Sequence, residues 1–183
     1  MADMTTNDIS SDNSLFTSEH LSVYSCASIF LENQTFMVEK VVELLTPQVV
    51  KALPIGWQGI ETPKQALNWL NDRFNESNLL AIKLKQSHEI IGFVFIHKTE
   101  ENVSPASFNI GYLIGEKYWG KGYASEVLTA LVNYYKNQAK ASILLAGVET
   151  DNIASIKVLE KCGFEISKSK MAQECNLFYE LRL

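Results

Sequence analysis

The sequence has few of the residues that build metal sites or covalent cross-links. Its 183 residues include three cysteines and three histidines, and neither type occurs at a spacing typical of zinc ligands. An odd number of cysteines without a CxxC pair is typical of reduced, buried thiols. We therefore expect neither a metal site nor a disulfide framework.

Long hydrophobic runs and an excess of positive charge are also absent. The longest apolar runs, Ile90–Ile96 and Ile143–Val148, have the length of strands and fall short of the ~18 residues of a membrane helix. The N-terminus lacks the basic start and apolar stretch of a signal peptide. A formal net charge of −5 argues against a nucleic-acid surface. We expect a soluble, cytoplasmic protein that binds neither membrane nor nucleic acid.

The sequence does contain enough apolar residues for one core. Hydrophobic residues make up 46% and charged residues 20% of the chain, which is typical of a single globular domain at this length. Met1–Ser18 is rich in Ser, Thr, Asn and Asp and has few apolar anchors. We therefore expect a mobile tail over residues 1–18 and one domain over residues 19–183.

The hydrophobic pattern predicts a mixed α/β fold in which helices alternate with a hairpin-rich sheet. Thr62 followed by Pro63 is a typical helix start. Gly111, inside a strand pattern, predicts a bulge or the close approach of another backbone. The strongest strand signals are Leu79–Leu84, Ile90–His97, Ser107–Ile114 and Ile143–Glu149.

Two segments contain the residues that indicate chemistry. The first, GYLIGEKYWGKGYAS over residues 111–125, leads from a strand through a glycine-rich turn into a helix. Gly120 and Gly122 let backbone N–H groups approach an anion without a Cβ in the way, and the helix N-terminus adds the positive end of its dipole. A tight turn that needs glycine for its own geometry explains the same pattern.

The second segment is TDNIASIKVLEKCGF over residues 150–164, directly after the apolar strand. Asn152 and Ser155 are three residues apart, so they share one face of a helix and can face one cleft. An N-cap and a first-turn hydroxyl are the simpler explanation of these two residues.

A nucleotide-binding loop is a further alternative for the glycine-rich turn. The stretch from Gly115 to Lys121 matches the first seven positions of a P-loop. The eighth position, where a Ser or Thr hydroxyl would bind magnesium, is Gly122. Nucleotide binding is therefore the weakest of the functional hypotheses.

Together the two segments resemble the GNAT superfamily of acyl-CoA-dependent N-acyltransferases, and within it the branch of the ribosomal-protein N-terminal acetyltransferases. The family turn, Gln/Arg-x-x-Gly-x-Gly/Ala, is matched at Gly122 and Ala124, with Trp119 in its first position. The resemblance covers about residues 18–183. The downstream family signature is matched at Asn152, Ser155, Val158, Gly163 and Phe164.

The resemblance implies a mixed, mostly antiparallel sheet with helices on both faces and two parallel strands that splay apart, here Asn109–Ile114 and Ile143–Glu149. It implies acetyl-CoA as co-substrate in the gap between those strands, and no metal. The implied cofactor-binding residues are Leu113 and Ile114 through their backbones, Gly120, Lys121, Gly122, Tyr123, Ala124 and Ser125 around the turn, Asn152, and Lys161 through its charge.

The resemblance also implies direct attack of a neutral amine on the thioester, which needs a base for the amine and benefits from an acid for the thiolate. Many relatives carry a tyrosine acid where this chain has Leu159, and Ser155 is the predicted substitute. The frequent glutamate base is replaced by Asn109, which cannot accept a proton. Glu149 is a weaker candidate base, as are Glu39 and Glu43.

The acceptor site is predicted between the first two helices and the loop over residues 53–60. Trp57 of that loop either lines a substrate slot or packs as core, and Asn109 is predicted to face the acceptor. Glu19–Asn78 holds seven acidic and four basic residues, which mildly suits a cationic amine. The amine of a protein N-terminus and that of a small molecule suit it equally.

Two functional classes stay open beside nucleotide binding. The first is an active acetyltransferase. The second is a CoA-binding sensor or partner-binding module with weak catalysis, which Asn109 and Leu159 favour because they replace proton-handling residues. The acceptor, the acyl-chain preference and the choice between monomer and homodimer are left open by the sequence.

Overall fold

The computed structural model describes residues 13–51, 53–99, 106–138, 141–168 and 175–183. The helices are α1 (Cys26–Glu32), α2 (Gln34–Leu44), α3 (Pro47–Val50), α4 (Pro63–Glu76), α5 (Tyr123–Gln138) and α6 (Ile153–Lys161), with 3-10 turns η1 (Ile55–Trp57) and η2 (Glu116–Tyr118). The strands are β1 (Phe16–Thr17), β2 (Leu21–Ser25), β3 (Asn78–Leu84), β4 (Ile90–Lys98), β5 (Ala106–Ile114), β6 (Ala141–Glu149), β7 (Glu165–Ile166) and β8 (Asn176–Arg182).

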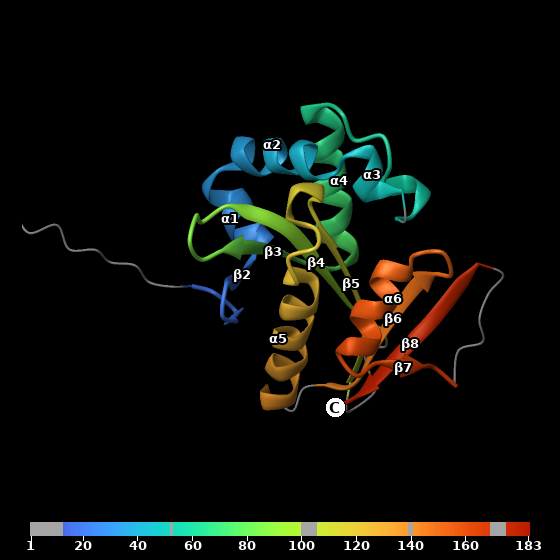
Figure 1. Ribbon diagram of the computed structural model, residues 1–183. Helices are drawn as coiled ribbons and strands as arrows, with labels where there is room; N and C mark the ends of the chain where they lie inside the picture. The colour runs from blue at the N-terminus through green and yellow to red at the C-terminus, as the bar shows by residue number, and fades with distance from the viewer. Residues whose placement is uncertain (1–12, 52, 100–105, 139–140, 169–174) are drawn as a thin grey trace, which may run out of the picture.

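The strands form one sheet in the order β1-β2-β3-β4-β5-β6-β8-β7. Every neighbouring pair is antiparallel except β5 and β6, which are parallel. Figure 1 shows α1 to α4 gathered at one side of this sheet and α5 with α6 at the other. The predicted class, a mixed and mostly antiparallel α/β sheet with one parallel pair, is confirmed.

Aromatic contacts show that the helices cover both faces. Trp69 of α4 packs on Phe95 of β4, with ring centroids 6.0 Å apart, and Tyr135 of α5 packs on Phe108 of β5, at 4.9 Å. Phe108 lies opposite Lys98 in the β4–β5 register, so Phe95, three residues before Lys98, points to the other face. The α4 face and the α5 face of the sheet are therefore distinct.

The start of α4 follows from its first residues. The Thr62 hydroxyl accepts the Gln65 N–H at 3.3 Å, and the Gln65 side-chain oxygen accepts the Thr62 N–H at 2.9 Å. This reciprocal pair is a capping box, and Pro63 occupies the first helical position. The predicted helix start is confirmed.

The glycine that allows close strand packing is Gly92, and the prediction for Gly111 is wrong. A Cβ on Gly111 would lie 3.7 Å from the Phe95 ring, which is an ordinary contact. A Cβ on Gly92 would lie 2.2 Å from the carbonyl oxygen of Leu113, a distance that no side chain tolerates.

The folded chain begins before the boundary predicted at Ser18. Phe16 and Thr17 pair with β2 as strand β1, and the Phe16 ring packs 5.1 Å from the ring of Tyr134 on α5. The Ser18 hydroxyl donates to Glu126 of α5 at 2.6 Å. The predicted boundary is therefore too late in the chain, and the rest of the predicted tail, residues 1–12, lies outside the described residues.

The three cysteines are free, but they differ in burial. Cys26 is buried, Cys162 is half-buried and Cys175 is exposed, so the expectation of buried thiols holds for Cys26 alone. Burial raises the pKa of the Cys26 thiol, a shift that the charge of Lys83 opposes.

Among the described helices, none combines the length and apolarity needed to cross a bilayer. Across all the residues that the structure describes, no group of three or more His, Cys, Asp or Glu side chains is placed to hold a metal ion.

Candidate active site at the gap between β5 and β6

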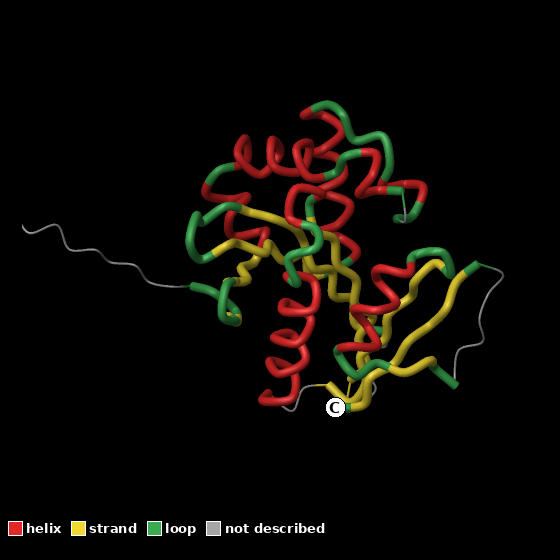
Figure 2. Tube along the Cα trace, in the orientation of Figure 1, coloured by secondary structure: helices red, strands yellow, loops and turns green. Residues whose placement is uncertain are grey.

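The parallel strands β5 and β6 separate toward their carboxyl ends. Their ladder pairs Phe108 with Leu144 and Asn109 with Leu145, and it ends there. Beyond that point β5 continues along β4 and β6 continues along β8. Figure 2 shows the two halves of the sheet diverging above the short ladder. This is the splayed strand pair that the sequence resemblance implied.

Tyr112 and Ile114 point their backbone N–H and C=O groups into the gap. Along an inner strand, the backbone N–H and C=O groups of one residue point to one neighbouring strand, and those of the next residue point to the strand on the other side. The Gly115 N–H donates to the Ile91 carbonyl at 2.8 Å, so Gly115 bonds to β4. Along the β4–β5 register, Leu113 bonds to β4 as well, whereas Tyr112 and Ile114 point away from β4. Leu113 therefore uses its backbone groups within the β4–β5 ladder. The geometry therefore favours the backbone of Tyr112 for the cofactor contact that was predicted at Leu113.

The carbonyl of Ile114 already has a partner in the chain. The indole Nε1 of Trp119 donates to it at 2.6 Å, although the Trp119 residue is 49% exposed. The carbonyl oxygen has a second lone pair, so a ligand could share this group with the indole or displace the indole. The cofactor contact of the Ile114 backbone stays a prediction.

The glycine-rich turn presents backbone N–H groups to open space. Gly120 and Gly122 have φ of +72° and +83°, and no atom lies within 4 Å of a Cβ built on either. The first bond of α5 runs from the Glu126 N–H to the Gly122 carbonyl at 3.0 Å. The N–H groups of Tyr123, Ala124 and Ser125 therefore precede the helical hydrogen bonds. Both explanations of the glycines hold: the backbone requires them, and the space above them can hold an anion.

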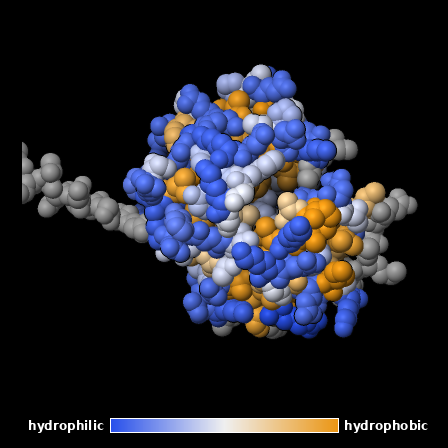
Figure 3. Space-filling view, in the orientation of Figure 1, coloured by the Kyte–Doolittle hydropathy of each residue, from blue (hydrophilic) through white to orange (hydrophobic). Residues whose placement is uncertain are grey.

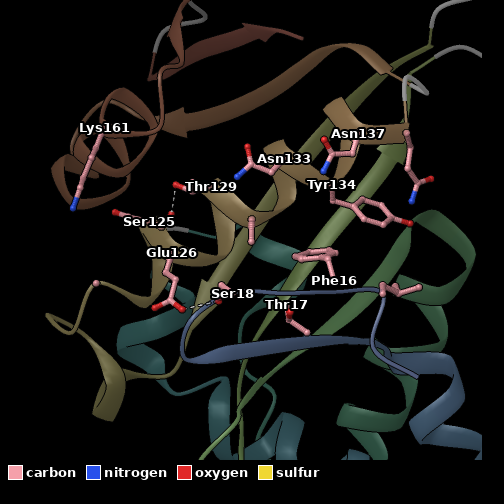
Figure 4. A pocket seen from close by; sticks show the side chains of 14 residues that line it. Phe16, Thr17, Ser18, Ser125, Glu126, Thr129, Asn133, Tyr134, Asn137 and Lys161 are labelled. Atoms are coloured by element: carbon pink, nitrogen blue, oxygen red, sulfur yellow. Dashed lines mark hydrogen bonds between the residues drawn. The ribbon is translucent and has the colours of Figure 1, made fainter. Parts of the chain in front are cut away.

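A groove of about 660 Å³ begins at this turn and follows α5 toward its carboxyl end (Figure 4). Gly122, Ser125 and Lys161 line its first part, so the predicted charge of Lys161 lies beside the turn. Lys121 lies instead over the ring of Tyr118, with its Nζ 5.6 Å from the centroid. The lining residues of the groove are Leu15, Phe16, Thr17, Ser18, Gly122, Ser125, Glu126, Thr129, Ala130, Asn133, Tyr134, Asn137, Gln138 and Lys161.

Asn152 and Ser155 begin α6 beside the gap. The Asn152 Oδ1 accepts the Ser155 N–H at 3.1 Å, so the N-cap explanation is confirmed. The cap uses only the oxygen of the carboxamide, and the Nδ2 donors stay available to a ligand. Leu159, at the position where relatives carry an acid, is buried in the core.

Figure 3 shows the surface hollowed between the α1–α4 helices and α6, with hydrophobic side chains beside the hollow.

Tyr112 is a functional candidate that sequence reasoning missed. Its hydroxyl donates to the Ser155 carbonyl at 3.5 Å, across the gap from β5 to α6. Burial raises the pKa of Tyr112 to about 12, while the hydrogen bond to Ser155 opposes the shift, so the phenol is neutral at pH 7. The signal available in the sequence was strand alternation, which puts Tyr112 on the same face as Phe108 and hence toward α5 and α6.

The residues predicted for the acceptor site or its base lie on the α4 face of the sheet. Asn109 lies on the face of Gly111, two residues away, and Gly111 packs on Phe95 below α4. Glu149 lies four residues after Leu145, the partner of Asn109, so alternation places it on that face too. Trp57 contacts Phe95, with ring centroids 4.5 Å apart, and is half-buried. It therefore packs against the core, and its role as the wall of a substrate slot stays a prediction.

The candidate bases on α2 differ from Glu149. Glu43 forms ion pairs with Lys40 and with Lys117, the latter at 2.8 Å. The hydrogen bond from Lys117 and that from Lys40 hold the pKa of Glu43 below its usual value. A carboxylate with two cations and a lowered pKa is a weaker proton acceptor, which argues against Glu43 as the base. Glu39 is exposed on the same helix.

Three features define the class of protein: a parallel strand pair that opens, a glycine turn that leads into a helix, and an asparagine-capped helix beside the opening. These are the features of an N-acetyltransferase. Residues 37–165 match the family described as the acetyltransferase (GNAT) domain. Because this match spans well over half of the 183 residues, the chain belongs to the GNAT acetyltransferase family.

Individual relatives agree with this assignment. The uncharacterized N-acetyltransferase p20 of Bacillus licheniformis is 30% identical over 122 residues, which cover 65% of this chain and 67% of the relative. The ribosomal protein uS5-alanine N-acetyltransferase of Escherichia coli strain K12 is 30% identical over 117 residues, 61% of this chain and 55% of the relative. The structure of RimL, a ribosomal L7/L12 α-N-protein acetyltransferase, in complex with coenzyme A has a TM-score of 0.68 at 16% identity, over 91% of this chain and 96% of that one.

Proposed function

We propose that the protein transfers an acetyl group from acetyl-CoA to the primary amine of a protein N-terminus or of a small molecule, by direct attack within a ternary complex. The observation that carries this proposal is the row of backbone groups of Tyr112 and Ile114 in the gap, in line with the open glycine turn at α5. The relatives named above, including one solved with coenzyme A, support the same co-substrate.

The chain offers donors and acceptors for the pantetheine arm and the pyrophosphate of acetyl-CoA. The backbone groups of Tyr112 and the N–H of Ile114 would bond to the amides of the pantetheine arm, and the Asn152 Nδ2 would bond to the same arm from α6. The N–H groups from Gly120 to Ser125 would hold the pyrophosphate at the α5 N-terminus, with Lys161 neutralising charge. When bound, acetyl-CoA supplies an acetyl group activated as a thioester.

The amine must lose a proton before or during its attack. Glu149 is the proposed base, because its carboxylate lies on the acceptor face of the gap and Asn109 cannot accept a proton. A protein N-terminus, with a reference pKa of ~7.7–8.0, is already partly neutral near pH 7.5 and needs the base less than an alkylamine does. The proton passes to the Glu149 carboxylate or to water.

The departing thiolate benefits from a proton donor on α6. Ser155 is the proposed donor, because its hydroxyl takes no part in the N-cap and Leu159 cannot act as an acid. Tyr112 is proposed as a positioning residue, since its hydroxyl bonds to the Ser155 carbonyl and so fixes the first turn of α6.

The test is thermal melting of the full chain with acetyl-CoA, CoA and magnesium-ATP in parallel, followed by thiol release with an amine panel. A ligand at 100 times its Kd adds ~2.7 kcal/mol, which raises the Tm by roughly 5–10 °C at this chain length. We expect the shift with both CoA species and none with ATP, and thiol release with at least one amine. A shift without thiol release from any amine would instead support the CoA-binding module. No shift with either CoA species would refute the proposal.

A further inference from the structure

Hydrogen-bond donors without acceptors gather between α4, η1 and β4. The Nε and Nη1 of Arg73 and the Nε1 of Trp69 are buried, and none has a partner in the described part of the chain. Arg73 is 6% and Trp69 is 2% exposed. The ring of Trp57 covers the guanidinium, with its centroid 4.5 Å from Cζ. We call these three donors the Arg73 cluster.

Packing within the protein accounts for only part of the Arg73 cluster. The guanidinium lies 4.5 Å from the Trp57 ring centroid and 5.8 Å from that of Trp69, and these ring contacts supply no acceptor for its N–H groups. The Nη2 of Arg73 is paired with Glu76 at 2.8 Å, but that leaves the other nitrogens of the guanidinium unpaired. A buried donor that has lost its water and gained no acceptor is costly, and more so on a charged group. Three such donors in one place indicate a ligand that supplies the acceptors.

The charge of the cluster favours a carboxylate. Arg73 contributes one positive charge, which Glu76 offsets only from a side chain that is 61% exposed. That balance suits a single negative charge rather than a doubly charged phosphate. The Trp57 and Trp69 rings meet at 90° with centroids 5.9 Å apart, so a carboxylate would be held by the unpaired donors and not between parallel rings.

The position of the cluster connects it to the gap. Trp57 packs on Phe95 of β4, and Phe95 lies opposite Gly111 of β5, which has no side chain to block the path. Asn109 and Glu149 lie on this same face, beside the end of the β5–β6 ladder. Because neighbouring strands are ~4.8 Å apart, the cluster and the gap are one or two strand spacings apart, about 5–10 Å.

We propose that the amine acceptor has a carboxylate about 5–10 Å from its reactive nitrogen, and that Arg73 and Trp69 bind that carboxylate. The role of the amine as acceptor rests on the proposed acetyl transfer, whereas binding of the carboxylate does not depend on it. A short peptide with a free carboxyl terminus and an ω-amino acid share this chemistry. Binding would add a negative charge beside the Trp57 and Trp69 rings that contact the guanidinium, so tryptophan fluorescence can report it.

The first experiment compares each acid with its own amide as acceptor. The pairs are 6-aminohexanoate with 6-aminohexanamide, and Ala-Ala with Ala-Ala amide, each assayed with acetyl-CoA and the full chain. We expect kcat/KM at least tenfold higher for the acid of one pair, through a lower KM. Which pair responds distinguishes the ω-amino acid from the peptide.

The variants are Arg73→Gln, Trp69→Phe and the control Lys64→Gln, which removes an exposed charge from the same helix. We expect Arg73→Gln to reduce the preference for the acid to about onefold and Trp69→Phe to reduce it at least threefold. The readout is the ratio of kcat/KM for each acid to that for its amide, and Lys64→Gln should keep the wild-type ratio. If Arg73→Gln fails to fold, Trp69→Phe, which keeps the ring and removes the donor, decides the matter.

The second experiment is independent of turnover. Without any CoA, 6-aminohexanoate and Ala-Ala are titrated while tryptophan fluorescence is followed, with their amides as controls. We expect a saturable change with an acid only, abolished by Arg73→Gln. Equal responses to acid and amide in both experiments would overturn the Arg73 proposal. Carboxylate binding without any melting shift by CoA would keep it and refute acetyl transfer.

Discussion

Replacement of Gly122 by alanine separates the conformational role of this glycine from its role at the ligand site. With φ at +83°, an L residue costs ~1–2 kcal/mol, and alanine regains about 0.5 kcal/mol by restricting the unfolded chain. No atom lies within 4 Å of the new Cβ, so there is no steric term. We expect a net loss of ~1 kcal/mol and a Tm lower by roughly 2–4 °C.

The effect on acetyl-CoA should be larger than the effect on folding. The new Cβ stands in the open space that the Tyr123 to Ser125 N–H groups border, and charge-assisted hydrogen bonds contribute ~1.5–3 kcal/mol each. Loss of one raises the Kd for acetyl-CoA by about tenfold or more, since 1.4 kcal/mol is a factor of ten. Isothermal titration calorimetry measures that Kd directly.

The matched control for this experiment is Gly59→Ala. Gly59 has φ of +70° and equally open surroundings, but it lies in the loop before α4, far along the chain from the glycine turn. It should lower the Tm by a similar amount and leave the Kd for acetyl-CoA unchanged. Equal Kd changes in the two variants, or none in Gly122→Ala, would refute the role of the glycine turn in binding.

Three further predictions follow from the contacts of the site. Asn152→Asp keeps the oxygen that caps α6 but loses the Nδ2 donors, so it should weaken acetyl-CoA binding without lowering the Tm. Asn152→Ala loses both the cap and the donors, so it should lower the affinity for acetyl-CoA and the Tm. Calorimetry measures the affinity and thermal melting measures the Tm. Ser155→Ala keeps the backbone cap and should lower kcat with little change in the Kd for acetyl-CoA, and unchanged kinetics would remove Ser155 from the mechanism. For Glu126, the hydrogen bonds from Ser18 and His20 outweigh burial and lower its pKa, so the ionised form stabilises the fold above pH ~4.3 and loses this effect as the pH falls through the lowered pKa. Glu126→Gln should therefore lower the Tm at pH 7 and not at pH 3, and an equal loss at both would contradict the charge assignment.

The sequence predicts local structure well where a few adjacent residues decide it. Thr62, Pro63 and Gln65 form the start of α4 without help from the rest of the chain. Asn152 likewise caps α6 through a bond to a residue three positions away. The motifs around the glycine turn and α6 were recognisable for the same reason, because each lies within one short segment.

Errors arise where a second segment decides the outcome. The family resemblance implied the backbone of Leu113, but the direction of a backbone N–H depends on register with a neighbouring strand, and the β4–β5 register directs the groups of Tyr112 to the gap. The close contact of Gly92 depends on the Leu113 carbonyl in the next strand, and β1 is only two residues long. None of these contacts is visible in a single segment.

The Arg73 cluster was missed for a related reason. On an amphipathic helix such as α4, an arginine is normally a solvated charge. Here Trp57, from a loop 16 positions earlier, covers the guanidinium and turns it into a buried group. Burial of a charge by a distant loop leaves no local pattern in the sequence.

The gap also gives a single sheet an internal pair of strand edges. Exposed edges with unpaired N–H and C=O groups invite pairing with other chains and so favour aggregation. In this protein the bond from Trp119 blocks one acceptor on the β5 edge, and Tyr112 connects that edge to α6. We therefore expect these two aromatic residues to hinder mispairing while the gap is empty, and a substitution at Trp119 to lower solubility.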